Sequence, residues 1–419
     1  MKYILIKNAT VIDPNSVHHL KQTDLLMESG IIKSIAKNLA PVDGETEIIE
    51  EQDLHVSIGW MDFRVNFNDP GNEHKEDLMS GAAAALKGGF TAVACMGTTN
   101  PALHSKSQIE YIINKSKHLP IDIYPIGTVT TKAEGADLAE LYDMSLSGAI
   151  AFSDNKNPLA NAELLQRAML YASGFNKKII QLPLDKKIAN EGKMNEGKVS
   201  TTLGLKGIPA IAEELMLQRD LMLAAHHNVA IHFGGVSTGG SVDLIRKAKK
   251  AGVKVTCDVH VVNLLLKDEV LQDFDTNYKI MPPLRTQADI DALIEGLKDN
   301  TIDVICSDHT PQDTESKVKE FDIAEFGIIG LETFYGVLCK ALENKLSITQ
   351  LIEKVAINPR KIVDIDLPKI EVAQSANLTV FSPTQTWNYN LEKGLSKSKN
   401  SPFDGIEFKG KVIKAILQK

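Results

Sequence analysis

The sequence is poor in cysteine and in net positive charge, and it has no apolar run long enough to cross a membrane. Its four cysteines (Cys95, Cys257, Cys306 and Cys339) form no Cys-x-x-Cys pair, so we expect reduced structural thiols rather than a disulfide framework. A net charge of −8 without a block of Lys or Arg argues against non-specific nucleic-acid binding. Residues 1–12 alternate like a strand and lack the apolar core of a signal peptide. These absences predict a cytoplasmic protein that binds neither nucleic acid nor membrane.

The two ends of the chain share one pattern, in which short strand-like runs are separated by glycine and proline. These runs cover residues 3–7, 10–13, 24–28, 31–36 and 47–50 near the start, and 378–382 and 410–417 near the end. Strand-rich ends that flank a different middle often pair with each other. We therefore predict a small composite β-sandwich domain built from residues 1–55 and 366–419.

The middle of the chain, residues 56–365, alternates apolar strand-like runs with amphipathic helical segments. The strand-like runs are 61–67, 91–96, 121–129, 149–153, 178–183, 229–233, 253–259 and 302–307. Helical spacing is clearest at 75–87, 105–117, 161–172, 210–225 and 241–251. Eight strands with helical crossovers predict an α/β fold, a (β/α)8 TIM-type barrel. Chemistry in such a barrel belongs at the C-terminal ends of the strands, and the polar segment 185–207 is expected to cross that face.

Residues 60–71 (Trp-Met-Asp-Phe-Arg-Val-Asn-Phe-Asn-Asp-Pro-Gly) alternate apolar and polar side chains, which places Arg64, Asn66 and Asn68 on one face of a strand. This stretch resembles the first barrel strand of the dihydroorotase family of cyclic amidohydrolases, where the pattern is Asp-x-His-x-His-x-Arg-x-Pro-Gly. Further motifs follow in the family's order over nearly the whole chain. They cover residues 71–76, 88–96, 99–101, 194–197, 203–209, 236–238, 282–285, 307–311, 327–333 and 396–405.

The resemblance implies a zinc-dependent barrel that hydrolyses the cyclic amide of dihydroorotate in pyrimidine synthesis. The family's metal positions are two histidines on strand 1, an aspartate after strand 4, histidines on strands 5 and 6, and an aspartate after strand 8. They correspond here to Arg64, Asn66, Asp154, Leu182, Gly235 and Asp308. All four histidines are replaced, and two carboxylates alone do not make a two-zinc site. Asp308 corresponds to the family's general acid/base, and we expect it to be vestigial.

The positions that bind substrate in the family have changed as well. They correspond to Asn68, Thr98, Met281 and Gln312, so an amide stands where the family has the arginine that clamps the substrate carboxylate. We hypothesise that the Arg64 guanidinium fills the vacated metal volume and pairs with Asp154, Asp308 or both. The alternative is a rearranged mononuclear metal site at Asp258, His260, Asp308 and His309.

Two functions follow from the resemblance. The first is a non-catalytic, metal-free dihydroorotase-like chain, an oligomer such as a homodimer, that acts as a partner or structural subunit of aspartate carbamoyltransferase, as some inactive members of the family do. The second is an active dihydroorotase, or an enzyme for a related cyclic amide, that binds zinc through unusual ligands. Because no histidine stands at the metal positions, we favour the first.

Overall fold

A barrel of eight parallel strands forms the centre of the computed structural model, which describes residues 3–42 and 46–418. Residues 1–2, 43–45 and 419 of the predicted terminal domain lie outside the described part. The strand order is β15-β14-β13-β10-β9-β8-β7-β6, and the barrel closes where Val65 pairs with His309. The strands are β6 (Trp60–Val65), β7 (Phe90–Met96), β8 (Asp122–Gly127), β9 (Ala151–Phe152), β10 (Ile179–Gln181), β13 (Ile231–Phe233), β14 (Val255–His260) and β15 (Val304–Cys306). The predicted α/β barrel is confirmed.

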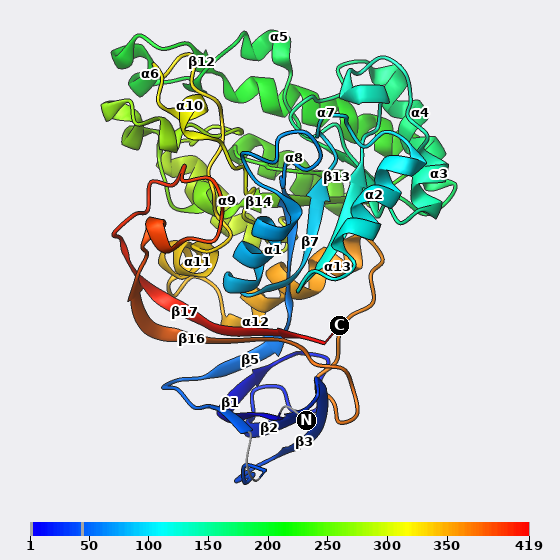
Figure 1. Cartoon of the computed structure of the whole chain (residues 1–419). Coiled ribbons are helices and arrows are strands. Elements are labelled where there is room, and N and C mark those ends of the chain that lie inside the picture. The colour runs from blue at the N-terminus through cyan, green and yellow to red at the C-terminus, as the bar shows by residue number, and fades with distance from the viewer. Residues whose placement is uncertain (1–2, 43–45, 419) are drawn as a thin grey trace.

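Helices connect the strands and cover the outside of the barrel (Figure 1). The longer ones are α1 (Leu78–Lys87), α2 (Lys106–Ser116), α4 (Ala162–Ser173), α7 (Ala210–His227), α8 (Gly239–Lys250), α9 (Gln287–Lys298) and α11 (Phe334–Leu342). Shorter ones are α3 (Leu141–Leu146), α10 (Thr314–Lys317), α12 (Ile348–Ile352) and α13 (Asn358–Ile362). Helix α1 begins later than predicted because the Asp77 side chain accepts a hydrogen bond from the Ser80 amide and caps it. In the described ranges, every helix is too short or too polar to cross a bilayer.

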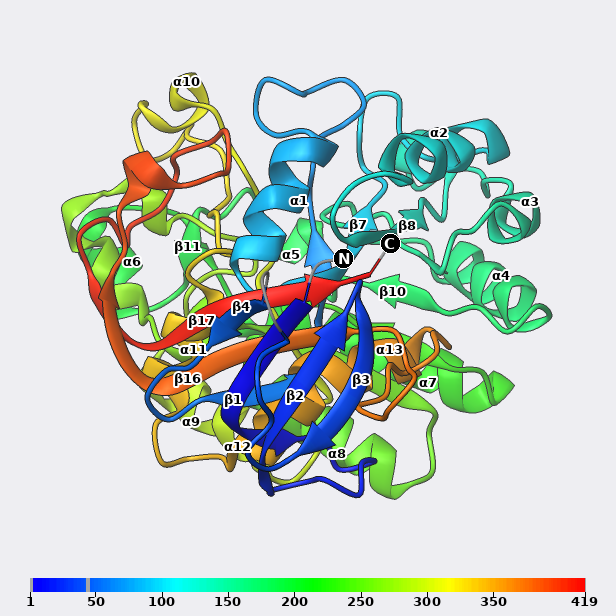
Figure 2. The same ribbon diagram turned by 60° about the horizontal axis from the view of Figure 1, so that its bottom comes forward.

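Both ends of the chain form one seven-stranded sheet with the order β17-β16-β5-β1-β2-β3, and β4 pairs with β1. Its strands are β1 (Tyr3–Ile12), β2 (Gln22–Glu28), β3 (Ile31–Ala36), β4 (Thr46–Ile49), β5 (His55–Ile58), β16 (Asn377–Asn388) and β17 (Glu407–Leu417). Strand β5 is the link, because it pairs with β1 on one side and antiparallel with β16 on the other. Figure 2 shows β16 and β17 beside β1, β2 and β3 at this end of the molecule.

The segment between β10 and α7 crosses the opposite end of the barrel. It contains α5 (Lys186–Ala189), β11 (Met194–Asn195), α6 (Lys198–Leu203) and β12 (Gly207–Ile208). In Figure 1 these elements lie above the barrel and the seven-stranded sheet lies below it. The barrel interior between the two ends is packed with apolar side chains, including Met61, Phe63, Ile126 and Val304. Barrels of this kind carry their chemistry at the C-terminal ends of the strands, which is the end that the segment after β10 covers.

Candidate functional site

Arg64, at the end of β6, lies fully buried in the barrel mouth. Its Nε atom is 3.2 Å from Asp308 Oδ1, and its Nη2 atom donates a hydrogen bond to Asn155 Oδ1 at 3.1 Å. Gly234 leaves the room for it, since a Cβ atom added there would lie 2.0 Å from Arg64 Nη1. The guanidinium is thus held between strands that are far apart in the sequence, and it pairs with Asp308 as hypothesised.

The Lys156 ammonium is a second cation in contact with Asp308. The Lys156 ammonium donates to Asp308 Oδ2 and to Thr310 Oγ1, both at 3.2 Å, and His260 Nδ1 lies 3.5 Å from Asp308 Oδ2. Burial alone would raise the pKa of Asp308, but the nearby His260, Lys156 and Arg64 outweigh it and hold the pKa below its ordinary value. The carboxylate that survives from the family's metal positions is therefore ionised and enclosed by protein cations.

Asp154 does not take part in this cluster. Its carboxylate accepts hydrogen bonds from the backbone amides of Val129 (2.8 Å) and Thr130 (3.1 Å), and from the Thr130 hydroxyl (2.5 Å). The next residue, Asn155, faces the site and donates to Asn66 Oδ1 at 2.8 Å and to Thr98 Oγ1 at 2.9 Å. The expected pairing with Arg64 is therefore made by Asp308, and Asn155 stands where Asp154 was expected.

The positions of the two later histidines offer no donor atoms. Leu182 is 2% exposed and packs in an apolar cluster with Leu184, Ala189 and Ile208. Gly235 adopts the left-handed region with φ +72°, and a Cβ atom added there would lie 2.9 Å from His260 Nε2. A side chain at Gly235 would therefore have to displace His260, and Leu182 presents only carbon atoms.

The cavity over this cluster has a volume of about 580 Å³, which is within the range of small-molecule sites. All four positions that correspond to substrate contacts in the family (Asn68, Thr98, Met281 and Gln312) line it. Their polar groups are largely engaged with the protein, as when Asn68 Nδ2 donates to Pro311 O (3.3 Å) and Gln312 Nε2 to Phe326 O (3.0 Å). A ligand-sized space has been kept, but the arginine clamp of the family is absent from these positions.

The alternative mononuclear site is only partly assembled. His309 faces elsewhere, because its Nε2 pairs with Glu76 at 3.3 Å and its Nδ1 accepts from the Gly330 amide at 3.2 Å.

Asp258, His260 and Cys306 do lie together, with one ligand atom of each within 4.8 Å of the others. However, Asp258 already accepts from the Gly235 amide at 2.6 Å and pairs with His232 at 3.0 Å. Burial raises the pKa of the Cys306 thiol well above its ordinary value, which disfavours the thiolate that a metal requires.

The donor set does not fit the zinc pair of the family. Only one of the six predicted metal positions, Asp308, presents a carboxylate to the site, and the Arg64 guanidinium and the Lys156 ammonium already face it. Two unit charges of like sign 4 Å apart repel by about 4 kcal/mol at an effective dielectric constant near 20. A divalent cation in this space would lie near two protein cations that already contact Asp308.

Sequence reasoning missed Asn155 and Lys156 as members of this cluster. Lys156 and Asp308 are 152 residues apart, and no local pattern signals their contact. His260 was noted only as a metal ligand, but it is buried and both of its ring nitrogens lack a hydrogen-bond partner in the described part of the chain. Burial lowers the pKa of its imidazole, and the neighbouring Asp308 carboxylate opposes that shift.

Comparison with known proteins gives a consistent picture. The family model described as "Dihydro-orotase-like" matches residues 55–240. A protein named dihydroorotase from Acetivibrio thermocellus is 41% identical over 417 residues, which is 99% of this chain and 97% of that protein. Another with the same name from Geobacter metallireducens is 42% identical over 416 residues, 99% of this chain and 98% of that protein.

Solved structures agree on the fold. L-hydantoinase (dihydropyrimidinase) from Arthrobacter aurescens superposes with a TM-score of 0.85 at 21% identity and covers 100% of this chain and 95% of its own. Dihydropyrimidinase from Brevibacillus agri NCHU1002 gives a TM-score of 0.83 at 21% identity, with 99% of this chain and 94% of its own covered.

Proposed function

Because this chain belongs to the dihydroorotase family, we propose that it is a member that keeps the fold and has lost metal-dependent hydrolysis. The observation that carries the proposal is the buried Arg64 guanidinium, which pairs with Asp308 at 3.2 Å. The side chain occupies the mouth of the barrel where the family's strand 1 histidines bind metal. A protein cation takes the place of the metal ion in neutralising Asp308.

The chemical consequence follows from what zinc supplies. Bound zinc lowers the pKa of water from about 15.7 to about 7, which is on the order of 12 kcal/mol of help in forming hydroxide. A guanidinium cannot coordinate water or accept its proton, because all of its nitrogens are donors. Asp308 cannot serve readily as a base either, since two cations stabilise its charge. No residue at the six family metal positions would therefore generate the nucleophile as bound zinc does.

The second candidate is an active dihydroorotase. Relatives at about 40% identity over the full chain carry that name, and this favours the second candidate. The retained carboxylate Asp308 and the retained cavity also agree with it. It requires metal ligands other than those of the family, and among the described residues Asp258, His260 and Cys306 form a group that could supply them.

One experiment separates the two candidates. The purified chain is analysed for metal by mass spectrometry and assayed for dihydroorotate hydrolysis with and without added zinc. We expect less than 0.1 equivalent of zinc per chain and no turnover above a buffer blank. Stoichiometric zinc together with turnover would establish the active enzyme. The A. thermocellus protein, which is named dihydroorotase, serves as the positive control once its own turnover has been measured.

A non-hydrolytic member needs another role, and we propose that this chain serves as a structural or regulatory partner of aspartate carbamoyltransferase, with oligomerisation of its own. The support is its sequence resemblance to inactive dihydroorotase-like chains that assemble with that enzyme. Affinity-tagged chain expressed in its own host should retain the carbamoyltransferase at a fixed ratio in size-exclusion chromatography. Elution of the two proteins as separate species would remove this part of the proposal.

A further inference from the structure

The charged hydrogen-bond donors of the barrel-mouth cavity are ammonium groups. The amide groups of Asn66 and Asn155 are fully used: Asn66 Nδ2 donates to His309 O (3.2 Å) and Thr310 Oγ1 (3.0 Å), and Asn155 Nδ2 donates to Asn66 and Thr98. Three lysines also line the cavity, Lys156, Lys186 and Lys193. Each lysine offers three N–H donors and no acceptor. The cavity can therefore donate hydrogen bonds to a ligand whose polar groups are all acceptors.

The three ammonium groups retain unused donors. Lys156 uses two of its three on Asp308 and Thr310. Lys186 donates to Asn157 Oδ1 at 2.7 Å, and burial lowers the pKa of its ammonium group below the ordinary value. Within residues 3–42 and 46–418, the Lys193 ammonium has no hydrogen bond or ion pair. Two of these cations thus face the cavity without a carboxylate partner.

The charge balance of the cavity favours an anion. Its lining carries three ammonium groups against two carboxylates, Glu191 and Glu325. The Lys279 and Lys317 ammonium groups lie near Glu325 and offset its negative charge. A concave site with an excess of one sign in low-dielectric walls concentrates ligands of the opposite sign.

We propose that this cavity binds a small molecule bearing a phosphate group, held by Lys156, Lys186 and Lys193. Lysine binds phosphate as a point charge, whereas planar carboxylate recognition uses the two-pronged arginine fork. The one arginine of this site, Arg64, is fully buried beneath the cavity and packed against Gly234. The inference rests on the proposed function in one respect, namely that the ligand is held and not hydrolysed.

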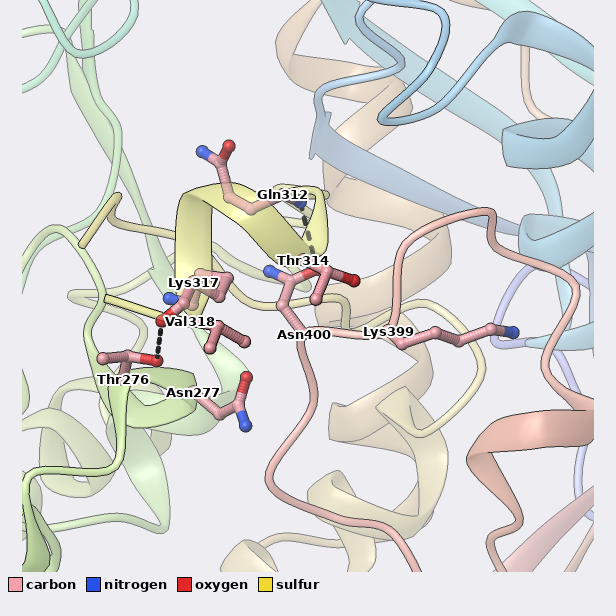
Figure 3. A pocket seen from close by; sticks show the side chains of 8 residues that line it. All are labelled: Thr276, Asn277, Gln312, Thr314, Lys317, Val318, Lys399 and Asn400. Carbon is pink, nitrogen blue, oxygen red and sulfur yellow. Dashed lines mark hydrogen bonds between the residues drawn. The ribbon is translucent and has the colours of Figure 1, made fainter. Parts of the chain in front are cut away.

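A second hollow of about 210 Å³, drawn in Figure 3, shares Gln312 with the cavity, but its two ammonium groups are bonded to backbone oxygens. Its Lys317 ammonium donates to the backbone oxygens of Glu325 (2.9 Å) and Gly327 (3.1 Å). Lys399 extends away from the group in Figure 3 and donates to the backbone oxygens of Leu391, Gly394 and Ser396. We therefore expect an anion to bind in the barrel-mouth cavity and not in this second hollow.

The test is titration of the full-length chain with inorganic pyrophosphate at constant ionic strength. Binding is measured by isothermal titration calorimetry and by the shift of the melting temperature. Constant ionic strength is needed because salt screens such contacts. The test variant is Lys186→Gln with Lys193→Gln. The matched control is Lys187→Gln with Lys198→Gln, which removes the same charge from exposed positions of the same segment that do not line the cavity. Far-ultraviolet circular dichroism checks that each variant is folded.

We expect saturable binding of pyrophosphate at one site per chain, an affinity at least about 10-fold lower in the cavity variant, and an unchanged affinity in the control variant. An equal loss in both variants, or no saturable binding by the parent chain, would overturn the inference. Malonate that binds as tightly as pyrophosphate would overturn the phosphate assignment. Turnover of dihydroorotate would defeat the proposed function alone, because the pyrophosphate titration does not depend on it.

Discussion

The Arg64 guanidinium fills the space that any side chain at position 234 would need, since a Cβ atom added to Gly234 would lie 2.0 Å from Arg64 Nη1. The two residues are on β6 and directly after β13, so the fit joins the first and sixth strands of the barrel. Gly234 is not among the residues with positive φ, so an alanine there meets a steric obstacle and no backbone strain. We expect Gly234→Ala to reduce the free energy of unfolding by about 1–3 kcal/mol.

A double-mutant cycle tests this fit directly. Arg64→Met shortens the side chain and removes its charge, so Gly234→Ala should cost less in that background. The coupling free energy should be at least about 0.5 kcal/mol, measured by urea denaturation with fluorescence detection. Strict additivity of the two substitutions would show that Arg64 does not occupy the volume next to Gly234.

Asp308 should be more important for stability than Lys156, although both belong to one charge cluster. Asp308→Asn leaves the buried guanidinium without its counter-ion, and breaking a buried pair in this way costs about 3–5 kcal/mol. The Lys156 side chain is 24% exposed, so water can replace its contact and Lys156→Gln should cost about 1 kcal/mol or less. Urea denaturation at pH 7 gives both values. The opposite order of costs would mean that the Arg64–Asp308 pair is not buried in solution.

The sequence predicts the barrel well because buried parallel strands are apolar runs that need no partner to be recognised. The run 302–307, for example, contains β15, and the run 91–96 lies within β7. The shorter strand β5 was not predicted. Its four residues form a strand because they pair with β1 and β16, and these pairings exist only in the folded sheet.

The site was predicted in part, for a related reason. The motifs place Arg64 and Asp308 at positions that meet at the metal site in the family, and the structure shows them in contact. Which of two adjacent residues after β9 faces the site depends on the turn. The amides of Val129 and Thr130 bind Asp154, and this turns Asn155 inward. The same turn places Lys156 near Asp308, and no pattern in the sequence predicts that contact.

Lys279 should hold one wall of the cavity in place. Its buried ammonium donates to the backbone oxygens of Phe321 (2.5 Å), Asp322 (3.2 Å) and Ala324 (2.6 Å), and it lies 4.9 Å from the centre of the Phe326 ring. Lys279→Met would leave these acceptors unpaired, so we expect a loss of about 1–3 kcal/mol. Hydrogen exchange should quicken chiefly in residues 318–327.

The matched control for this prediction is Lys319→Met, because Lys319 is exposed in the same segment. It should leave the exchange rates of residues 318–327 and the free energy of unfolding nearly unchanged. Uniform acceleration over the whole barrel in Lys279→Met would instead indicate global destabilisation and would argue against a local clamp.

Returning histidines to the family's metal positions should not create a hydrolase. Arg64→His with Asn66→His supplies two imidazoles, but Leu182 lies in an apolar cluster and Gly235 has no side chain. Adding Gly235→His forces a β-carbon to within 2.9 Å of His260 Nε2 at a φ of +72°, a conformation that costs about 1–3 kcal/mol for a residue other than glycine. We expect no dihydroorotate hydrolysis from either variant with 1 equivalent of zinc, and a lower melting temperature for the triple variant. Turnover by the double variant would show that two imidazoles and Asp308 suffice, and that Arg64 alone suppresses the chemistry of this barrel.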